Sequence, residues 1–547
     1  MPHTSDRNTN RNCRQHNAFR RRILLLALTM ALATGCSQAP QIQLAGAQGR
    51  ITKGPCLLRV YQDRAALMWE TDTPGQWGVS CGTRGRPDRH FVSTTGKVTY
   101  SGKPNDASAK TAYIHKVWIE GLVPGRTYTY RIVGPDVRSD IYRFRTVPAE
   151  ADEVRFIVYG DSRTQPDVHR QLVKQMITCN VDFVVHTGDL ASRGDDYQQW
   201  GPQFFEPLKG LMERVPIYIT KGNHEGRNGN FEKLLIPPEE ENSFGFDYGP
   251  LHYFCADNVS SVLDIGQLLS RIVRDAEASK TPWKFVSYHV PSVNFGGHWS
   301  DWSQGDALPA FANVGIDFVV VGHSHQYERF RPVEPAEQTG GYVTYITAGG
   351  GGAPLYPVEP TALHAFAKSV YHFCLFHIKG DTLTMDAIDP EGRVIDHLEV
   401  TKKDGRLDER YLSTAVPATA IQLHQSLYKG MEVALPGPLE AGEPRTISLR
   451  VAIPPFASGA KLTFELRGAS EAYQLPQPQT VEVSPEGGRA AVKLTVTPNV
   501  AINAKGGSGK AVPIEPALSL DCRYEFAGVS ATVSRPVTII RKQPSGQ

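Results

Sequence analysis

The chain has 547 residues, too many for a single hydrophobic core, so we expect two to four domains. Its composition, 40% hydrophobic and 21% charged, is ordinary for a globular protein and identifies no function. The net charge of +2 excludes a bulk electrostatic attraction to nucleic acid, and we predict no nucleic-acid partner.

The N-terminus has the pattern of an export signal. Three arginines at 20–22 precede an apolar run over residues 23–33, which is short for a membrane-spanning helix and typical of a signal peptide. Small residues then lead to Cys36, an order that resembles a bacterial lipoprotein signal. Residues 1–36 are therefore predicted to be a signal peptide of lipoprotein type, with Cys36 as the lipid anchor to a membrane. Plain cleavage and an uncleaved anchor stay open. The predicted location is the bacterial cell envelope, as a periplasmic or outer membrane lipoprotein, and otherwise the chain would be secreted.

Cys13 and Cys36 belong to the predicted signal peptide, and the other six cysteines are scattered and form no C-x-x-C pair, which disfavours zinc-finger ligation. They are Cys56, Cys81, Cys179, Cys255, Cys374 and Cys522. An exported chain can oxidise its thiols, and Cys56 and Cys81 are the expected pair because they lie in one small domain. The alternative is that all six are buried free thiols.

Residues 37–50 are rich in Gln, Ala and Gly and are predicted to be a flexible linker. Residues 51–148 show short alternating runs between turns, the pattern of an all-β domain. The spacing of Leu122, Pro124 and Tyr128 indicates the tyrosine corner of a β-sandwich, and Trp69 would fill its core. This domain resembles a fibronectin type III module, and we expect it to be a spacer without chemistry.

From residue 153 to 402 the pattern changes to short apolar strands that alternate with helical stretches. The strands are expected at 154–159, 181–186, 216–220, 284–288, 316–321 and 343–347, and a helix at Pro166–Ile177. Continuous apolar strands with intervening helices imply a sheet that is covered on both faces. Residues 411–547 return to alternating runs and are predicted to form a second β-sandwich. The expected fold class is therefore multidomain α/β plus β, with a central α/β sandwich flanked by N-terminal and C-terminal β-sandwiches.

Five of the predicted α/β strands end in side chains that can bind metal, and glycine precedes the first such side chain after four of these strands. These side chains are Asp161, Asp189, Asn223, His289, and His323 with His325. Because the carboxyl ends of strands in an open α/β sheet converge on one crevice, we expect the six residues to meet. Glycine allows the sharp turn and leaves room beside a ligand.

The residue types favour one kind of site. Two carboxylates, one amide and three imidazoles make an oxygen and nitrogen donor set suited to transition metals. The absence of thiolates from the set disfavours a structural zinc site. A carboxylate can bridge two ions, as in two-metal sites that hydrolyse phosphate esters.

The motifs Gly160-Asp161, Gly188-Asp189, Gly222-Asn223-His224-Glu225, Val286-Ser287-Tyr288-His289 and Gly322-His323-Ser324-His325 resemble the metallophosphoesterase (calcineurin-like phosphoesterase) superfamily. With the preceding β-sandwich and the continuation to Arg329, the resemblance is to the purple acid phosphatases. It implies that Asp161 and His325 bind a first metal, that Asn223, His289 and His323 bind a second, and that Asp189 bridges them. It also implies that His224 holds the substrate phosphate or protonates the leaving group, and that His298 is a substrate histidine.

Two positions depart from the family pattern. Ser192 stands where purple acid phosphatases have the tyrosine that binds Fe(III), so we expect no tyrosinate absorption band. Arg163 stands where other members of the superfamily have a histidine ligand, and a guanidinium cannot ligate a metal. The alternatives for the missing ligand are water, weak metal binding or recruitment of His169. Arg163 is a candidate to pair with substrate phosphate, and the alternative is a surface salt bridge.

The function that the resemblance implies is two-metal-dependent hydrolysis of phosphate esters. The expected enzyme is an acid phosphatase-like hydrolase of phosphomonoesters that uses a metal-bound hydroxide. Its cofactors would be two transition metal ions, Fe, Zn or Mn, and its partner a phosphate ester substrate. The alternatives are a phosphodiesterase of the same superfamily and a non-catalytic metal-binding surface lipoprotein.

Overall fold

A computed structural model describes residues 49–101, 109–260, 264–336, 340–436, 439–484, 488–502, 511–514 and 517–540. The predicted signal peptide, its anchor Cys36 and nearly all of the linker lie outside these residues. The signal peptide, the anchor and the location at the cell envelope therefore stay predictions. Within the described part of the chain, no helix combines the length and the hydropathy needed to cross a bilayer.

The first folded part is a sandwich of two four-stranded sheets. One sheet has the order β1 (Ile51–Val60), β2 (Arg64–Thr71), β6 (Lys110–Glu120) and β5 (Thr94–Tyr100). The other has the order β4 (Arg89–Val92), β3 (Gly78–Gly82), β7 (Thr127–Val133) and β8 (Tyr142–Arg145). The backbone N–H of Val123 donates to the Tyr128 hydroxyl at 2.9 Å, the contact expected of a tyrosine corner. Trp69 is fully buried between the sheets, as expected.

Strand β2 is buried on both of its faces, which explains its unbroken apolar sequence. Leu67 and Trp69 point into the sandwich, whereas Ala66 and Met68 belong to a core shared with the α/β domain. The domain that we expect to be a spacer without chemistry therefore packs directly on the α/β domain. The predicted disulfide is wrong for a related reason. Cys56 faces the shared core and Cys81 the sandwich interior, and both are free thiols.

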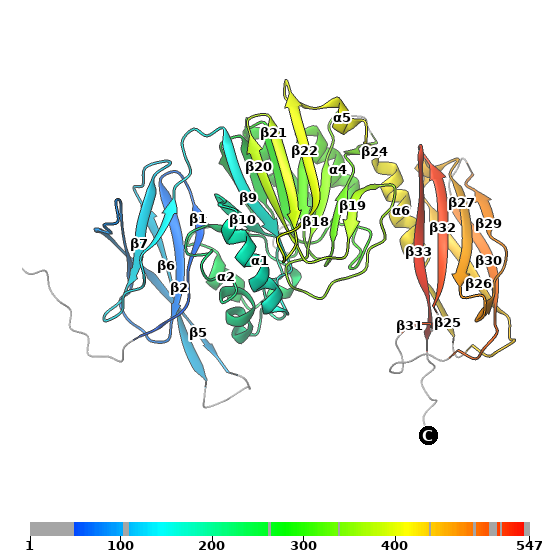
Figure 1. Cartoon of the computed structure of the whole chain (residues 1–547), viewed down its shortest axis with the longest axis horizontal. Helices are drawn as coiled ribbons and strands as arrows, with labels where there is room; N and C mark the ends of the chain where they lie inside the picture. The colour runs from blue at the N-terminus through cyan, green and yellow to red at the C-terminus, as the bar shows by residue number, and fades with distance from the viewer. Residues whose placement is uncertain are drawn as a thin grey trace, which may run out of the picture. The chain divides into compact units, whose positions relative to one another are not determined.

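The central domain contains two seven-stranded sheets (Figure 1). The first has the order β11 (Ile217–Ile219), β10 (Phe183–His186), β9 (Glu153–Tyr159), β20 (Phe373–Lys379), β21 (Thr382–Ile388), β22 (Val394–Lys403) and β23 (Arg406–Leu407). The second has the order β12 (Phe244–Tyr248), β13 (Leu251–Cys255), β14 (Trp283–Tyr288), β15 (Phe318–Val321), β18 (Thr344–Ala348), β16 (Tyr327–Phe330) and β19 (His364–Lys368). The predicted strands correspond to β9, β10, β11, β14, β15 and β18.

The inner faces of the two sheets pack on each other through aromatic side chains. Phe156 on β9 meets Phe285 on β14 edge to face, with ring centroids 5.4 Å apart. On the outer face of β9, Ile157 and Tyr159 pack in a different cluster. Both faces of the central strands are therefore buried, which is why their sequences are apolar throughout rather than alternating.

Helices cover the outer faces of the sheets and complete an α/β sandwich. Helix α1 (Pro166–Thr178) packs on the first sheet, and helices α3 (Ile265–Ala278) and α4 (Gln304–Asn313) pack on the second. Pro166 begins α1 as predicted. The shorter helical segments are α2 (Asn230–Leu235), the 3₁₀ turns Tyr197–Gln199 and Asn223–Glu225, and the π turn Gly201–Phe205.

The last part begins with two helices that sequence reasoning did not predict, α5 (Glu409–Leu412) and α6 (Ala418–Gly430). Helix α6 buries Ile421 against the central domain and Leu427 against the C-terminal strands, so it joins the two cores. The short pair β17 (Val333–Glu334) and β24 (Val416–Pro417) lies at the same junction.

The remaining strands form two sheets, as predicted for a β-sandwich. They are β25 (Val433–Pro436), β33 (Val529–Ile540), β32 (Leu518–Phe526), β27 (Lys461–Gly468), β29 (Gln479–Glu482) and β31 (Ala511–Pro513), with β26 (Arg445–Ile453), β30 (Gly488–Pro498) and β28 (Tyr473–Gln474). The 3₁₀ turn Pro455–Ala457 follows β26.

Candidate metal centre

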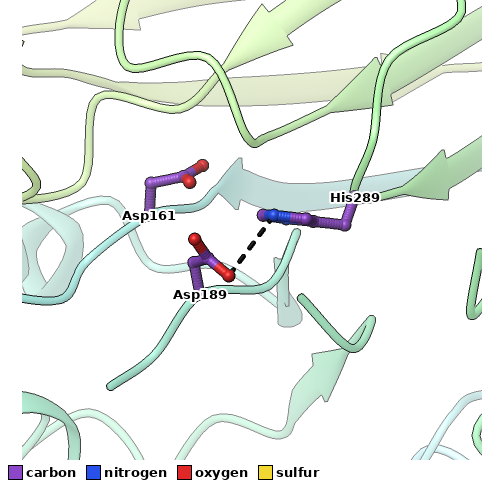
Figure 2. A group of neighbouring side chains, drawn as sticks. All are labelled: Asp161, Asp189 and His289. Atoms are coloured by element: carbon purple, nitrogen blue, oxygen red, sulfur yellow. Dashed lines mark ion pairs between the residues drawn. The ribbon is translucent and has the colours of Figure 1, made fainter. Parts of the chain in front are cut away.

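The ends of five strands from both sheets of the central domain meet at one point. Asp161 follows β9, and Asp189 follows its parallel neighbour β10. His289 follows β14 in the other sheet, and its ring lies against Asp189 (Figure 2). One ligand atom of each of these three buried residues lies within 4.8 Å of the others. The convergence expected from strand order is therefore present, although it brings together two sheets rather than one.

Three side chains form a compact donor group on one side of Asp189. The Oδ1 atom of Asn223 lies 2.9 Å from Nε2 of His289 and 2.9 Å from Nδ1 of His323. His289 Nε2 is also 3.3 Å from Oδ1 of Asp189. These residues are the predicted ligands of the second metal, together with the predicted bridging carboxylate.

A smaller donor group, formed by Asp161 and His325, lies on the other side of Asp189. Nε2 of His325 is 3.5 Å from Oδ1 of Asp161. That carboxylate oxygen is buried, and among the described residues it has no hydrogen-bond partner, whereas Oδ2 accepts a hydrogen bond from the His323 backbone N–H at 2.9 Å. A buried carboxylate oxygen without a donor is costly unless a cation pairs with it. The residues of the predicted first site therefore fit a metal ion.

Backbone carbonyls orient two of the imidazoles. Nδ1–H of His289 donates to the Thr187 carbonyl, and Nδ1–H of His325 donates to the Pro354 carbonyl, both at 2.8 Å. Because a carbonyl oxygen only accepts, Nδ1 carries a proton in each ring, and Nε2 is the atom left to bind a metal. Burial, followed by the neighbouring His289, lowers the pKa of His323 to about 3.

The charge of Asp189 is suited to a bridging role. Burial alone would raise its pKa, but the neighbouring His289 and His224 hold the pKa of this carboxyl below its ordinary value. Its Oδ1 accepts a hydrogen bond from the His224 backbone N–H at 2.9 Å. An ionised carboxylate with one oxygen toward each donor group can link two cations.

The backbone at the centre is held in an uncommon conformation. Asp161, Asp189 and His323 have φ values of +57°, +62° and +69°, in the left-handed region that few non-glycine residues adopt. Such strain persists only where the surrounding structure imposes it, and it concentrates at functional sites. Here it turns each of the three side chains from its strand end into the common centre.

The predicted substrate residues lie around the donors. Nε2 of His224 is 3.8 Å from Oδ2 of Asp189, and its Nδ1–H donates to the Ser192 carbonyl at 2.7 Å. The ring of His298 is exposed, with its centroid 5.0 Å from that of His323. Burial of part of the ring, and then the nearby His325, lower the pKa of His298.

Arg163 also lies at the centre rather than in a surface salt bridge. Its Nε donates to Oδ2 of Asp189 at 3.2 Å, and its side chain is only 11% exposed. His169, in contrast, is not available as a ligand. Its Nε2 contacts the Tyr159 hydroxyl at 2.9 Å and its Nδ1 the Gln203 carbonyl at 3.1 Å, so the idea that it fills the first site is wrong.

Sequence reasoning missed the part played by Glu225. Its carboxylate accepts the backbone N–H groups of Asp189, Leu190 and Gly222 at 2.7–2.8 Å, and so ties two ligand loops together. Burial, followed by the charge of Asp189, raises the pKa of Glu225 to about 7. The position of Glu225 in the motif 222–225 could have identified it from the sequence. Tyr356 stacks on His325 with ring centroids 4.4 Å apart, and no feature of the sequence indicated this contact.

Comparison with known families defines the class. Residues 154–327 match the family described as calcineurin-like phosphoesterase, and this range contains all nine predicted site residues. This part of the chain is thus similar to calcineurin-like phosphoesterase domains. Residues 59–146 match the family described as purple acid phosphatase, N-terminal domain.

Individual relatives agree with this assignment. Over 44% of this chain and 58% of its own length, "Purple acid phosphatase 21" of Arabidopsis thaliana is 29% identical. "Probable inactive purple acid phosphatase 1" of the same plant is 23% identical over 51% of this chain and 56% of its own. The chain therefore spans less than three fifths of the length of these two relatives. The structure of purple acid phosphatase PPD1 from yellow lupin (Lupinus luteus) seeds has a TM-score of 0.52 at 19% identity, covers 68% of this chain and 76% of its own, and shows a similar fold.

Proposed function

We propose that this chain is a metal-dependent hydrolase of phosphate monoesters. The observation that carries the proposal is the meeting of six oxygen and nitrogen donors from five strand ends in one place, with the buried carboxylate of Asp189 among them. The fold implies a dinuclear metal centre, and we propose Fe, Zn or Mn as its ions. Ions bound there supply Lewis acidity, activate water and neutralise charge on the phosphoryl oxygens.

The side chains around the centre have separate proposed roles. Asp161 and His325 hold the first ion, and Asn223, His289 and His323 hold the second, with Asp189 between them. His224 keeps Nδ1–H on the Ser192 carbonyl, which aims Nε2 at the centre. In the imidazolium form, its Nε2–H can hold the phosphate or pass a proton to the leaving oxygen. His298 lies on the open side, where it can contact a substrate oxygen.

A cavity of about 820 Å³ beside His224 provides room for the organic part of the substrate. Its lining includes Asn223 and His224 from the centre, the segment 192–198, and residues 98–101 at the end of β5. The N-terminal sandwich therefore contributes part of the wall. Such a polar, open cavity suits a single alcohol leaving group joined to a phosphate at the metals.

The replacement Asp189→Asn tests the proposal. Asn keeps the size and tolerates the left-handed backbone, but it removes the bridging charge. We expect it to lower kcat for an aryl phosphate by on the order of 10³-fold and to reduce bound metal. The measurements are initial rates and elemental analysis, with exposed Asp306→Asn as the matched control. A bis-aryl phosphate assayed alongside distinguishes a diesterase. Full metal content without turnover of any ester would reject the enzyme in favour of a metal-binding protein.

A further inference from the structure

The guanidinium of Arg163 occupies the donors of the predicted first metal. Its Nε donates to Oδ2 of Asp189 at 3.2 Å, and its Nη2 donates to the lone pair on Nε2 of His325 at 3.4 Å. These are two of the three side chains assigned to the first position, and only Asp161 is left. The positively charged guanidinium of Arg163 thus lies among the predicted ligands of the first metal.

The second position has no such competitor. Within the described part of the chain, the hydrogen bonds of the Arg163 side chain go to Asp189, His325 and Thr164. On Asp189 it uses Oδ2, whereas His289 lies against Oδ1. The second position therefore keeps Asn223, His289, His323 and one oxygen of Asp189, which makes four protein donors.

The positive charge of Arg163 opposes metal binding at the first position. A guanidinium stays protonated in proteins and has no lone pair to offer, so it cannot become the missing fourth ligand. A divalent ion beside it is repelled, and the repulsion is strong because the site is buried. An ion enters the first position only by breaking the hydrogen bonds to Asp189 and His325.

We propose that Arg163 makes the two metal positions unequal. The second position binds its ion directly, and the first binds one only after the guanidinium has left its donors. This inference rests on the proposed metal centre and concerns the order and strength of its filling. We expect the first position to bind on the order of 10- to 100-fold more weakly than it does without the guanidinium.

Zinc titration of the full-length chain tests the inference without any activity assay. The metal-free protein is titrated with Zn²⁺ against a competing chelator, and zinc per chain is also measured after a chelator wash. The wild type is expected to bind in two separated steps and to keep about one ion through the wash, because only the second position has its full donor set. Arg163→Met is expected to tighten the weaker step by on the order of 10- to 100-fold. Arg163→His, which adds a donor, is expected to retain two ions.

Two comparisons keep the test sharp. Arg50→Met removes an exposed arginine that pairs with Asp72, away from the site, and should leave both steps unchanged. Circular dichroism shows whether each variant folds. If Arg163→Met does not fold, the zinc titration of Arg163→His tests the inference instead. Two equal tight steps in the wild type, or a weaker step that no Arg163 variant moves, would overturn the inference while leaving the metal centre intact. A wild type that binds no zinc would reject the metal centre and the inference together.

Discussion

Gly222 lies so close to Asp189 that a side chain does not fit between them. A Cβ atom at this position would lie 2.3 Å from both the backbone nitrogen and Oδ1 of Asp189, and 2.6 Å from Oε2 of Glu225. Its φ of −98° is open to any residue, so the reason for glycine is space rather than backbone freedom. The sequence pattern placed glycine before the ligands but did not show which atoms require it.

We predict that Gly222→Ala pushes Asp189 away from the donors. The overpacked site should cost about 1–3 kcal/mol of unfolding free energy and reduce zinc per chain. Urea unfolding and elemental analysis measure the two effects. Gly305→Ala, at a position with open space in helix α4, is the matched control and should be neutral or stabilise by about 0.4–1 kcal/mol. Equal behaviour of the two variants would show that the close approach is unimportant.

At the scale of elements, a buried ion pair connects the two central sheets. Arg329 on β16 and Asp396 on β22 form two hydrogen bonds, Nε to Oδ2 at 2.7 Å and Nη2 to Oδ1 at 2.8 Å. Their side chains are 10% and 7% exposed, and the Tyr327 hydroxyl also donates to Oδ2 at 2.7 Å. Arg329 ends the family-like run after Gly322, but no local feature of the sequence identifies its partner 67 residues away.

Arg329→Met is predicted to lower the free energy of unfolding by about 3–5 kcal/mol, because it leaves the Asp396 charge buried with the Tyr327 hydroxyl as its remaining hydrogen-bond donor. Removing both charges, as in Arg329→Met with Asp396→Leu, should cost less than the single change. Chemical denaturation of the two variants measures the difference. Arg50→Met removes an exposed ion pair with Asp72 and should hardly change the denaturation midpoint. A double variant less stable than the single one would contradict the buried-charge argument.

At the scale of the whole molecule, the folded parts that the structure describes share cores that cross the predicted domain boundaries. One cluster contains side chains of β1, β2 and β5 together with those of α1 and the segment 204–212. Helix α6 contributes in the same way to both the central and the C-terminal cores. Sequence periodicity indicated three folded parts but not that they share buried surface, since an apolar residue does not reveal which neighbour buries it.

We predict that the N-terminal sandwich and the central domain unfold together. Met68→Ala, in the shared core, and Leu67→Ala, inside the sandwich, should each cost about 2–5 kcal/mol and lower the same calorimetric transition. The two residues are adjacent on β2 and point to opposite faces, so they form a matched pair. An early separate transition in Leu67→Ala alone would show that the sandwich unfolds independently.

Strand ends and their glycines were readable from the sequence because they depend on local patterns. The six predicted strands lie within two residues of observed ones, and the six donors that follow them meet. The antiparallel strands β20–β22 and the helix α6 were not predicted, nor were the contacts of Arg163 and Glu225. A short-range pattern determines where a strand stops and which side chain follows. Only tertiary packing decides which distant atoms come within 3–4 Å, and with it the unequal surroundings of the two metal positions.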